Sequence, residues 1–221
     1  MTFSYPSISG VFQIGEESVC SIVIENQSLF CEVLQDISDQ IEGLNGKAIL
    51  SERNNLLDFS KYSDLLSVFI PFSINKKTLT NKILTVLEKR SLDPEYYEKT
   101  MRLSADVEKF VDELSSDFPC DLVYTKLGIP AILKAIGVEV ADDSETLAEK
   151  IMNYMELVRE FDRDRVFFTV NLRSFLDDKS TSAFLRAVLS HKYKLIMLES
   201  RSYSLLPQES RRTIDEDLCE F

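Results

Sequence analysis

The chain has 221 residues, of which 44% are hydrophobic and 28% are charged, and its formal net charge is −12 at pH 7. This composition is that of an ordinary globular protein and excludes a chain that is mainly disordered. The negative charge argues against a polyanion as partner, unless the cations are gathered in one region.

The N-terminus, MTFSYPSISG, lacks the basic and apolar segments of a signal peptide, and no apolar run approaches the roughly 20 residues of a membrane helix. We therefore expect a cytoplasmic protein that does not span a membrane. The four cysteines lack Cys-x-x-Cys spacing, which favours isolated thiols over a zinc site. The single histidine, His191, leaves little room for Ser–His or Cys–His catalysis and is explained by its place at the end of a predicted helix.

Five short apolar or β-branched runs predict strands, and helical patterns separate several of them. This alternation is typical of an α/β fold with a sheet that is at least partly parallel. The runs are SVCSIVIE, GKAILSE, LLSVFIPF, DRVFFTVNL and YKLIMLES. The ending, DEDLCEF, is a candidate for a last edge strand.

The first of these strands runs directly into an amphipathic helix, in the stretch SIVIENQSLFCEVLQDI. A phosphate-binding loop at such a junction usually needs glycines, because a phosphate must approach the backbone N–H groups closely. Glu25 and the polar residues up to Ser28 stand there instead. From the residues alone, the chain is therefore interpreted as a non-catalytic α/β scaffold.

Helical patterns without a strand signal extend from Asn75 to Gly137. Apolar residues recur there at helical spacing in Leu103, Val107, Phe110 and Leu114. Pro94 is compatible with one kinked helix or with two helices in series, and Pro119 is expected to end the second stretch.

Two further helices are predicted beyond this stretch. A short one, LGIPAILKAIGV, is closed by Gly137, and the next begins at Asp143 or Ser144 as N-cap. We therefore expect an α/β head domain made of residues 1–74 and 143–221, and an inserted α-helical leg domain of residues 75–142.

Positive charge is concentrated at the start of this insertion, in INKKTLTNKILTVLEKR. On a helical wheel, Leu79, Ile83, Val86 and Leu87 form the apolar side. The opposite arc carries Thr78, Asn81, Lys82, Thr85 and Lys89, with Lys77 at its edge. Such an arc suits sequence-independent phosphate contacts, but from this segment alone a solvated helix face is the favoured interpretation.

Acidic side chains are densest in DELSSDFPCD and ADDSET. Ca²⁺ takes oxygen ligands, so Asp117 and Asp121 with nearby carbonyl groups are candidate ligands. Neither stretch has the EF-hand spacing, and helix capping with solvation also explains both. The pairs in RDR and at Arg211–Arg212 are too short to predict a basic patch.

Eight segments, in order and over nearly the whole chain, resemble one family. They are SIVIENQSLF, EGLNGKAILSERNNLLDFSKY, INKKTLTNKIL, ILKAIGVEV, EKIMNYMELV, VFFTVNLRSFL, HKYKLIMLES and IDEDLCEF. This pattern is similar to the Csn-two family, the small accessory proteins of type II-A CRISPR-Cas loci.

The resemblance implies an α/β head similar to a P-loop NTPase core but lacking the phosphate loop, with a helical leg inserted into it. It further implies a homotetrameric ring that encircles double-stranded DNA, prefers free ends and has no enzymatic activity or bound nucleotide. The implied role is spacer acquisition beside the CRISPR integrase pair and the guide-RNA nuclease. On this basis the candidates for the DNA channel are Lys47, Arg53, Lys61, Lys76, Lys77 and Lys82.

The resemblance also implies Ca²⁺ binding by acids near the junction of leg and head. This chain departs from the family there, because only Asp117 and Asp121 persist in SSDFPCDLVYT. Two other functions remain open at this stage. One is an α/β nucleotide hydrolase with an atypical loop, and the other is a protein-interaction scaffold without affinity for DNA.

Overall fold

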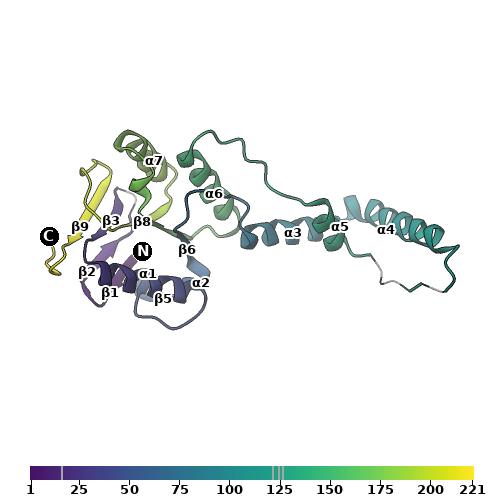
Figure 1. The fold of residues 1–221 in the computed structure, drawn as a ribbon, viewed down its shortest axis with the longest axis horizontal. Coiled ribbons are helices and arrows are strands. Elements are labelled where there is room, and N and C mark those ends of the chain that lie inside the picture. The colour runs from purple at the N-terminus through teal and green to yellow at the C-terminus, as the bar shows by residue number, and fades with distance from the viewer. Residues whose placement is uncertain (16, 121, 124, 126) are drawn as a thin grey trace. The chain divides into compact units, whose positions relative to one another are not determined.

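The computed structural model describes residues 1–15, 17–120, 122–123, 125 and 127–221. The chain divides into two compact units. The first, here called the head, comprises residues 1–74 and 143–221, and the second, the leg, comprises residues 75–142. Each unit is described by itself, with element labels as in Figure 1.

The centre of the head is a five-stranded sheet in which all neighbours are parallel, so the predicted α/β fold is confirmed. Every residue of β3 and β7 is buried, as expected of strands covered on both faces. In spatial order the strands are β6 (Ser63–Leu66), β7 (Val166–Val170), β8 (Lys194–Glu199), β3 (Val19–Ile24) and β9 (Glu209–Ile214). The likeness to a P-loop NTPase core stays a prediction.

A smaller antiparallel sheet completes the head. Its strands are, in spatial order, β2 (Ile8–Gln13), β1 (Thr2–Tyr5), β4 (Ile49–Glu52) and β5 (Asn55–Leu57). Side chains from this sheet and from α1 (Gln27–Ile41) form one buried core with β3, β7 and β8. The short α2 (Phe59–Tyr62) precedes β6.

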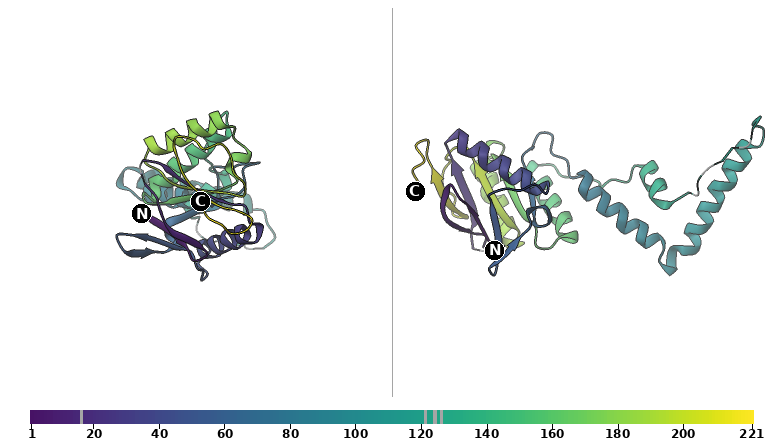
Figure 2. Two further views of the ribbon diagram at one scale, coloured as in Figure 1. Left: turned by 90° about the vertical axis from the view of Figure 1, so that its left-hand side faces the viewer. Right: turned by 90° about the horizontal axis from the view of Figure 1, so that it is seen from below.

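The two faces of the parallel sheet are covered by different elements (Figure 2). Phe168 in β7 contacts Phe3 of the antiparallel sheet, with ring centroids 5.4 Å apart. Its neighbour Phe167 points the opposite way, toward Tyr154 of α6 (Leu147–Phe161) at 6.4 Å. Because successive strand residues alternate between faces, α6 lies on the face opposite the antiparallel sheet. Helix α7 (Asp178–Ser190) packs against α6 there, and a 3-10 turn, η1 (Leu172–Ser174), follows β7.

The described residues of the leg form three helices: α3 (Lys77–Ser91), α4 (Pro94–Ser115) and α5 (Ile129–Ile136). Pro94 occupies the first turn of α4, so the alternative of two helices in series is the correct one. The turn between them is held by Thr100, whose hydroxyl donates to the Ser91 carbonyl oxygen at 2.8 Å. Gly137 ends α5 in the left-handed conformation, as predicted.

Three details of the sequence reading were wrong. Of the run LLSVFIPF, residues 65–72, only Leu65 and Leu66 lie in a strand, and the chain continues without regular structure through a cis Ile70–Pro71 bond. The edge of the parallel sheet is β9, whereas the ending DEDLCEF makes a single bridge between Ile214 and Glu220. The N-cap of α6 is Thr146, because only Thr146 and Glu149 form the reciprocal bonds of a capping box.

Candidate nucleic-acid interface

The turn between β3 and α1 is closed by side chains at the place where a phosphate loop would have glycines. Asn26 is the N-cap of α1, and its Oδ1 accepts a hydrogen bond from the Leu29 N–H at 3.0 Å. The N–H of Glu25 donates to the Ile214 carbonyl oxygen at 2.8 Å. The turn is therefore tied to the helix and to β9, and it presents no glycine backbone to a phosphate.

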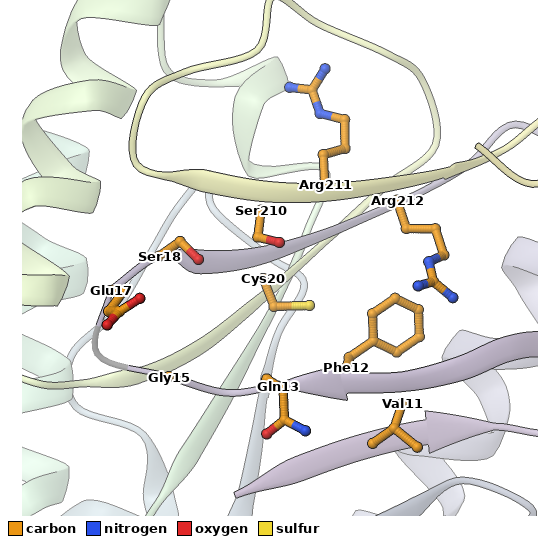
Figure 3. Close-up of a pocket in the computed structure, with 10 residues that line it drawn as sticks. All are labelled: Val11, Phe12, Gln13, Gly15, Glu17, Ser18, Cys20, Ser210, Arg211 and Arg212. Carbon is orange, nitrogen blue, oxygen red and sulfur yellow. The ribbon is translucent and has the colours of Figure 1, made fainter.

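A groove of about 540 Å³ lies beside β2, β3 and β9 (Figure 3). The Arg212 guanidinium lies 5.2 Å from the centre of the Phe12 ring, and it donates a hydrogen bond to the Ser9 carbonyl oxygen. The thiol of Cys20 points into the groove, but burial raises its pKa to about 12, so it is a poor nucleophile at neutral pH. Arg211 points away from the groove.

In the leg, α3 carries the cationic arc predicted from the sequence. Leu79 is buried, Ile83 and Leu87 are partly buried, and Val86 is 50% exposed, so the apolar side is narrower than expected. Between Asn75 and Ser91 there are five Lys or Arg residues and one acid, Glu88. The arc is thus locally positive in a chain of negative net charge.

The helix dipole favours the cations at one end of α3 and disfavours those at the other. Lys89 and Arg90 lie in the last turn, where the helix dipole favours positive charge. Lys76 and Lys77 lie at the N-cap and the first helical position, where the same dipole disfavours them, and no side-chain hydrogen bond from Lys76 caps the helix. Helix stability therefore explains the C-terminal pair and not the N-terminal pair. An anion bound near the N-terminal pair would offset their unfavourable interaction with the dipole.

The other three candidate cations lie in the head, on separate segments. Lys47 pairs with Glu32 at 2.7 Å, which raises the pKa of Lys47 through the hydrogen bond and charge of that carboxylate. Lys61, on α2, pairs with Asp58 at 3.5 Å. Arg53 is exposed at the tip of the β4–β5 hairpin, where its positive φ of 50° is typical of a tight hairpin turn.

The structure adds three cations that the sequence reading set aside or did not consider. Arg163 and Arg165, in the segment before β7, line a cavity of about 260 Å³ together with Lys61. Lys194, at the start of β8, pairs with Asp164 at 2.8 Å and approaches Glu52, the neighbour of Arg53, at 3.8 Å. Arg53 and Lys61 therefore lie near one edge of the head, the amino-terminal edge of the parallel sheet.

Helix α4 has an apolar stripe that its own unit leaves exposed. Thr100 is the one residue of this 22-residue helix that is fully buried. On the stripe, Leu103 is 47% exposed, Phe110 57% and Leu114 65%. Exposed apolar side chains in helical register are typical of a surface that packs against another protein chain.

A comparison with protein families identifies the chain. The model of the family described as CRISPR-associated protein (Cas_Csn2) matches residues 40–218, which is most of the sequence. The chain belongs to the Cas_Csn2 family. The resemblance drawn from the sequence segments is thereby confirmed, and the chain is CRISPR-associated. All six candidate cations lie within the matched residues. No curated protein matches the chain.

The acids expected near the leg of a Cas_Csn2 protein do not form a recognisable calcium site among the described residues. Asp117 is exposed in the segment after α4, and Asp121 lies outside the described residues. Within the described part of the chain, no group of three or more His, Cys, Asp or Glu residues is placed to hold a metal ion. Asp117 alone does not supply the six to eight oxygens that Ca²⁺ takes.

The helices of this Cas_Csn2 chain are amphipathic or short. Of the helices in the described residues, none combines the length and the apolar character needed to cross a bilayer.

Proposed function

We propose that this Cas_Csn2 chain is a non-enzymatic protein that binds double-stranded DNA without regard to sequence. In this proposal it assembles as a homotetrameric ring around DNA, prefers free ends and takes part in spacer acquisition in a type II-A CRISPR-Cas system. Its partners there are the CRISPR integrase pair and the guide-RNA nuclease. The observation that carries the proposal is the cationic N-terminal end of α3 in a chain of this family.

Charge supports the DNA-binding part of the proposal. Lys76 and Lys77 stand where helix stability does not favour them, and Lys82 follows about one and a half turns later. Lysine neutralises phosphate as a point charge and has no fixed geometry for reading bases. Several copies of Lys76, Lys77 and Lys82 around one axis would produce a positive field despite the net charge of −12.

The exposed stripe of α4 supports self-association. A helix of 22 residues is about 33 Å long at 1.5 Å per residue, and α4 buries one residue within its own unit. Helix stability in proteins comes mainly from packing of an apolar face. A second copy of the chain, laid against Leu103, Phe110 and Leu114, would supply that packing.

A gel-shift titration tests the proposal, with linear duplex DNA compared with the same duplex as a covalently closed circle. Retention of the linear form alone is expected, because a closed ring threads onto free ends. The same titration with and without Ca²⁺ tests the metal site implied by the family. Equal retention of both forms would replace the ring by an open binding surface, and retention of neither would contradict DNA binding.

A further inference from the structure

A buried polar cluster lies between the parallel sheet, α7 and the segment Ser200–Gln208, which connects β8 to β9. Its centre is Arg173, whose side chain is 1% exposed. The guanidinium pairs with Glu209 of β9 at 3.2 Å and with Asp178 of α7 at 2.5 Å. Arg211 of β9 pairs with the other oxygen of Glu209 at 2.5 Å.

Both arginines hold the connecting segment in place. Arg173 donates to the Ser204 carbonyl oxygen at 2.8 Å, and Arg211 donates to the Tyr203 carbonyl oxygen at 2.5 Å. The Tyr203 ring also lies under the Arg173 guanidinium, at 4.8 Å from its centroid. The conformation of Ser200–Gln208 therefore depends on where these two guanidinium groups sit.

Glu199, the last residue of β8, is buried beside this cluster and is 1% exposed. One carboxyl oxygen accepts the backbone N–H of Arg173 at 3.2 Å. Among the described residues the other oxygen, Oε2, has no hydrogen-bond partner. Ser21 and Thr169, which lie in register with Met197 two residues before Glu199, also have buried hydroxyls without a partner there.

Both arginines of the cluster have carboxylate partners other than Glu199. Arg173 and Arg211 share the buried Glu209, and Arg173 also pairs with Asp178, whose side chain is 55% exposed. Ionisation of Glu199 places a further negative charge close enough for Glu209 to repel it. A buried carboxylate with one unbonded oxygen is unfavourable, and burial therefore favours the neutral form of Glu199.

We propose that Glu199 is a proton-dependent latch, neutral in the folded head, whose ionisation loosens the segment Ser200–Gln208 by competing with Glu209 for Arg173. The groups facing Glu199 are the backbone N–H groups of Leu172 and Arg173 and the Arg173 charge, from the segment after β7, and the Glu209 carboxylate from β9. Burial is the main cause that raises the pKa of Glu199, to about 7. The latch therefore responds to pH near neutrality.

Hydrogen exchange of the full chain, measured by mass spectrometry and corrected for the intrinsic pH dependence of exchange, tests the latch. If Glu199 returns to its ordinary pKa of 4.5 when the segment opens, the protection of Ser200–Gln208 falls roughly tenfold between pH 6 and pH 8. In Glu199→Gln, which stays neutral, this fall is absent. Glu42→Gln, which changes an exposed residue at the end of α1, keeps it.

A fall in protection of the same size in Glu199→Gln, or constant protection in the wild-type protein, would overturn the latch. A second measurement does not depend on the folding of the variant. In the wild-type protein, a carbon-13 NMR titration of the Glu199 carboxyl carbon is expected to give a midpoint near neutral pH. A midpoint near the ordinary value for glutamate would also overturn the proposal.

Discussion

The side-chain amide of Asn26 donates a hydrogen bond to the backbone carbonyl oxygen of Glu216 at 2.9 Å, joining the start of α1 to the segment that follows β9. The same side chain caps α1 through its bond from the Leu29 N–H. One residue thus makes two internal hydrogen bonds at the junction of β3 and α1. The junction is a structural connection within the head.

Substitution of Asn26 tests this structural role. Asn26→Ala removes both the cap and the bond to Glu216, and the free energy of unfolding is expected to fall by about 1–2 kcal/mol. Asn26→Ser keeps a capping oxygen but cannot reach Glu216, so its loss is expected to be smaller. Urea unfolding measures both. Equal stability of Asn26→Ala and the wild-type protein would show that the turn does not depend on this side chain.

The four thiols are expected to differ in reactivity. Cys20 is buried and its pKa is raised to about 12, whereas Cys31, Cys120 and Cys219 are exposed. Because the thiolate is the reactive form, iodoacetamide at pH 8 is expected to modify three cysteines in the folded protein and four in urea. Mass spectrometry of the intact protein counts the adducts. If Cys20 in the folded protein reacts with iodoacetamide as fast as the other three cysteines, its thiol is accessible to solvent through the groove in Figure 3.

Glu199 also gives the stability of the head a definite pH dependence. Its pKa is higher in the folded state than in the unfolded state, so folding takes up a proton between pH 4.5 and about pH 7. The free energy of unfolding contributed by this group therefore falls as pH rises through that window, by about 3 kcal/mol in total. The stability of Glu199→Gln should lack this dependence on pH. At pH 8 the free energy of unfolding of the variant should exceed that of the wild-type protein. Urea unfolding of both proteins at pH 5 and pH 8 measures this difference. An equal change in the free energy of unfolding between the two pH values in both proteins would contradict the raised pKa of Glu199.

The sequence predicted those elements whose pattern is set by local physics. β3, β7 and β8 were predicted because buried parallel strands are continuous apolar runs, and α5 because Gly137 closes it. β9 was missed because its inward side chains include Glu209 and Arg211. Glu209 is buried through ion pairs with Arg211 and Arg173. The local sequence ESRRTI does not indicate that Arg173 is a partner.

The candidate interface was predictable to a similar extent. The arc on α3 is a periodic local feature and was found, whereas the grouping of Lys61 with Arg163 and Arg165 depends on α2 meeting the segment before β7. The capping box at Thr146 and Glu149 was present in the sequence as T-x-x-E, and attention to that motif would have corrected the start of α6.

The apolar stripe of α4 gives a prediction about oligomer formation. The double substitution Phe110→Asp with Leu114→Asp places two charges on the exposed stripe and is expected to reduce the mass of the assembly, because charge is costly at a packed apolar contact. Ala105→Asp adds a charge to the opposite, exposed side of α4 and is expected to leave the mass unchanged. Sedimentation velocity measures all three proteins. A monomeric wild-type protein would contradict the ring, and an unchanged mass in the double variant would place the contact elsewhere.

The two ends of α3 provide a matched test of the DNA surface. Lys76→Glu with Lys77→Glu reverses two charges at the N-terminus, where acids favour the helix, so any loss of DNA affinity cannot be attributed to a weakened helix. The affinity for linear duplex DNA is expected to fall at least tenfold. The slope of log affinity against log salt concentration is expected to become shallower, by about 0.9 for each phosphate that the variant no longer neutralises.

Lys89→Glu with Arg90→Glu makes the same change of charge at the C-terminus of the same helix. Those two cations are explained by the helix dipole, so their reversal is expected to cost some helix stability but to leave the salt slope almost unchanged. Fluorescence anisotropy at several salt concentrations measures affinity and slope for both variants. Equal losses of affinity in the two variants would indicate a response to net charge alone. Unchanged affinity in the N-terminal variant would place the DNA surface elsewhere. The next candidate would then be the edge of the head that carries Lys61 and Arg163.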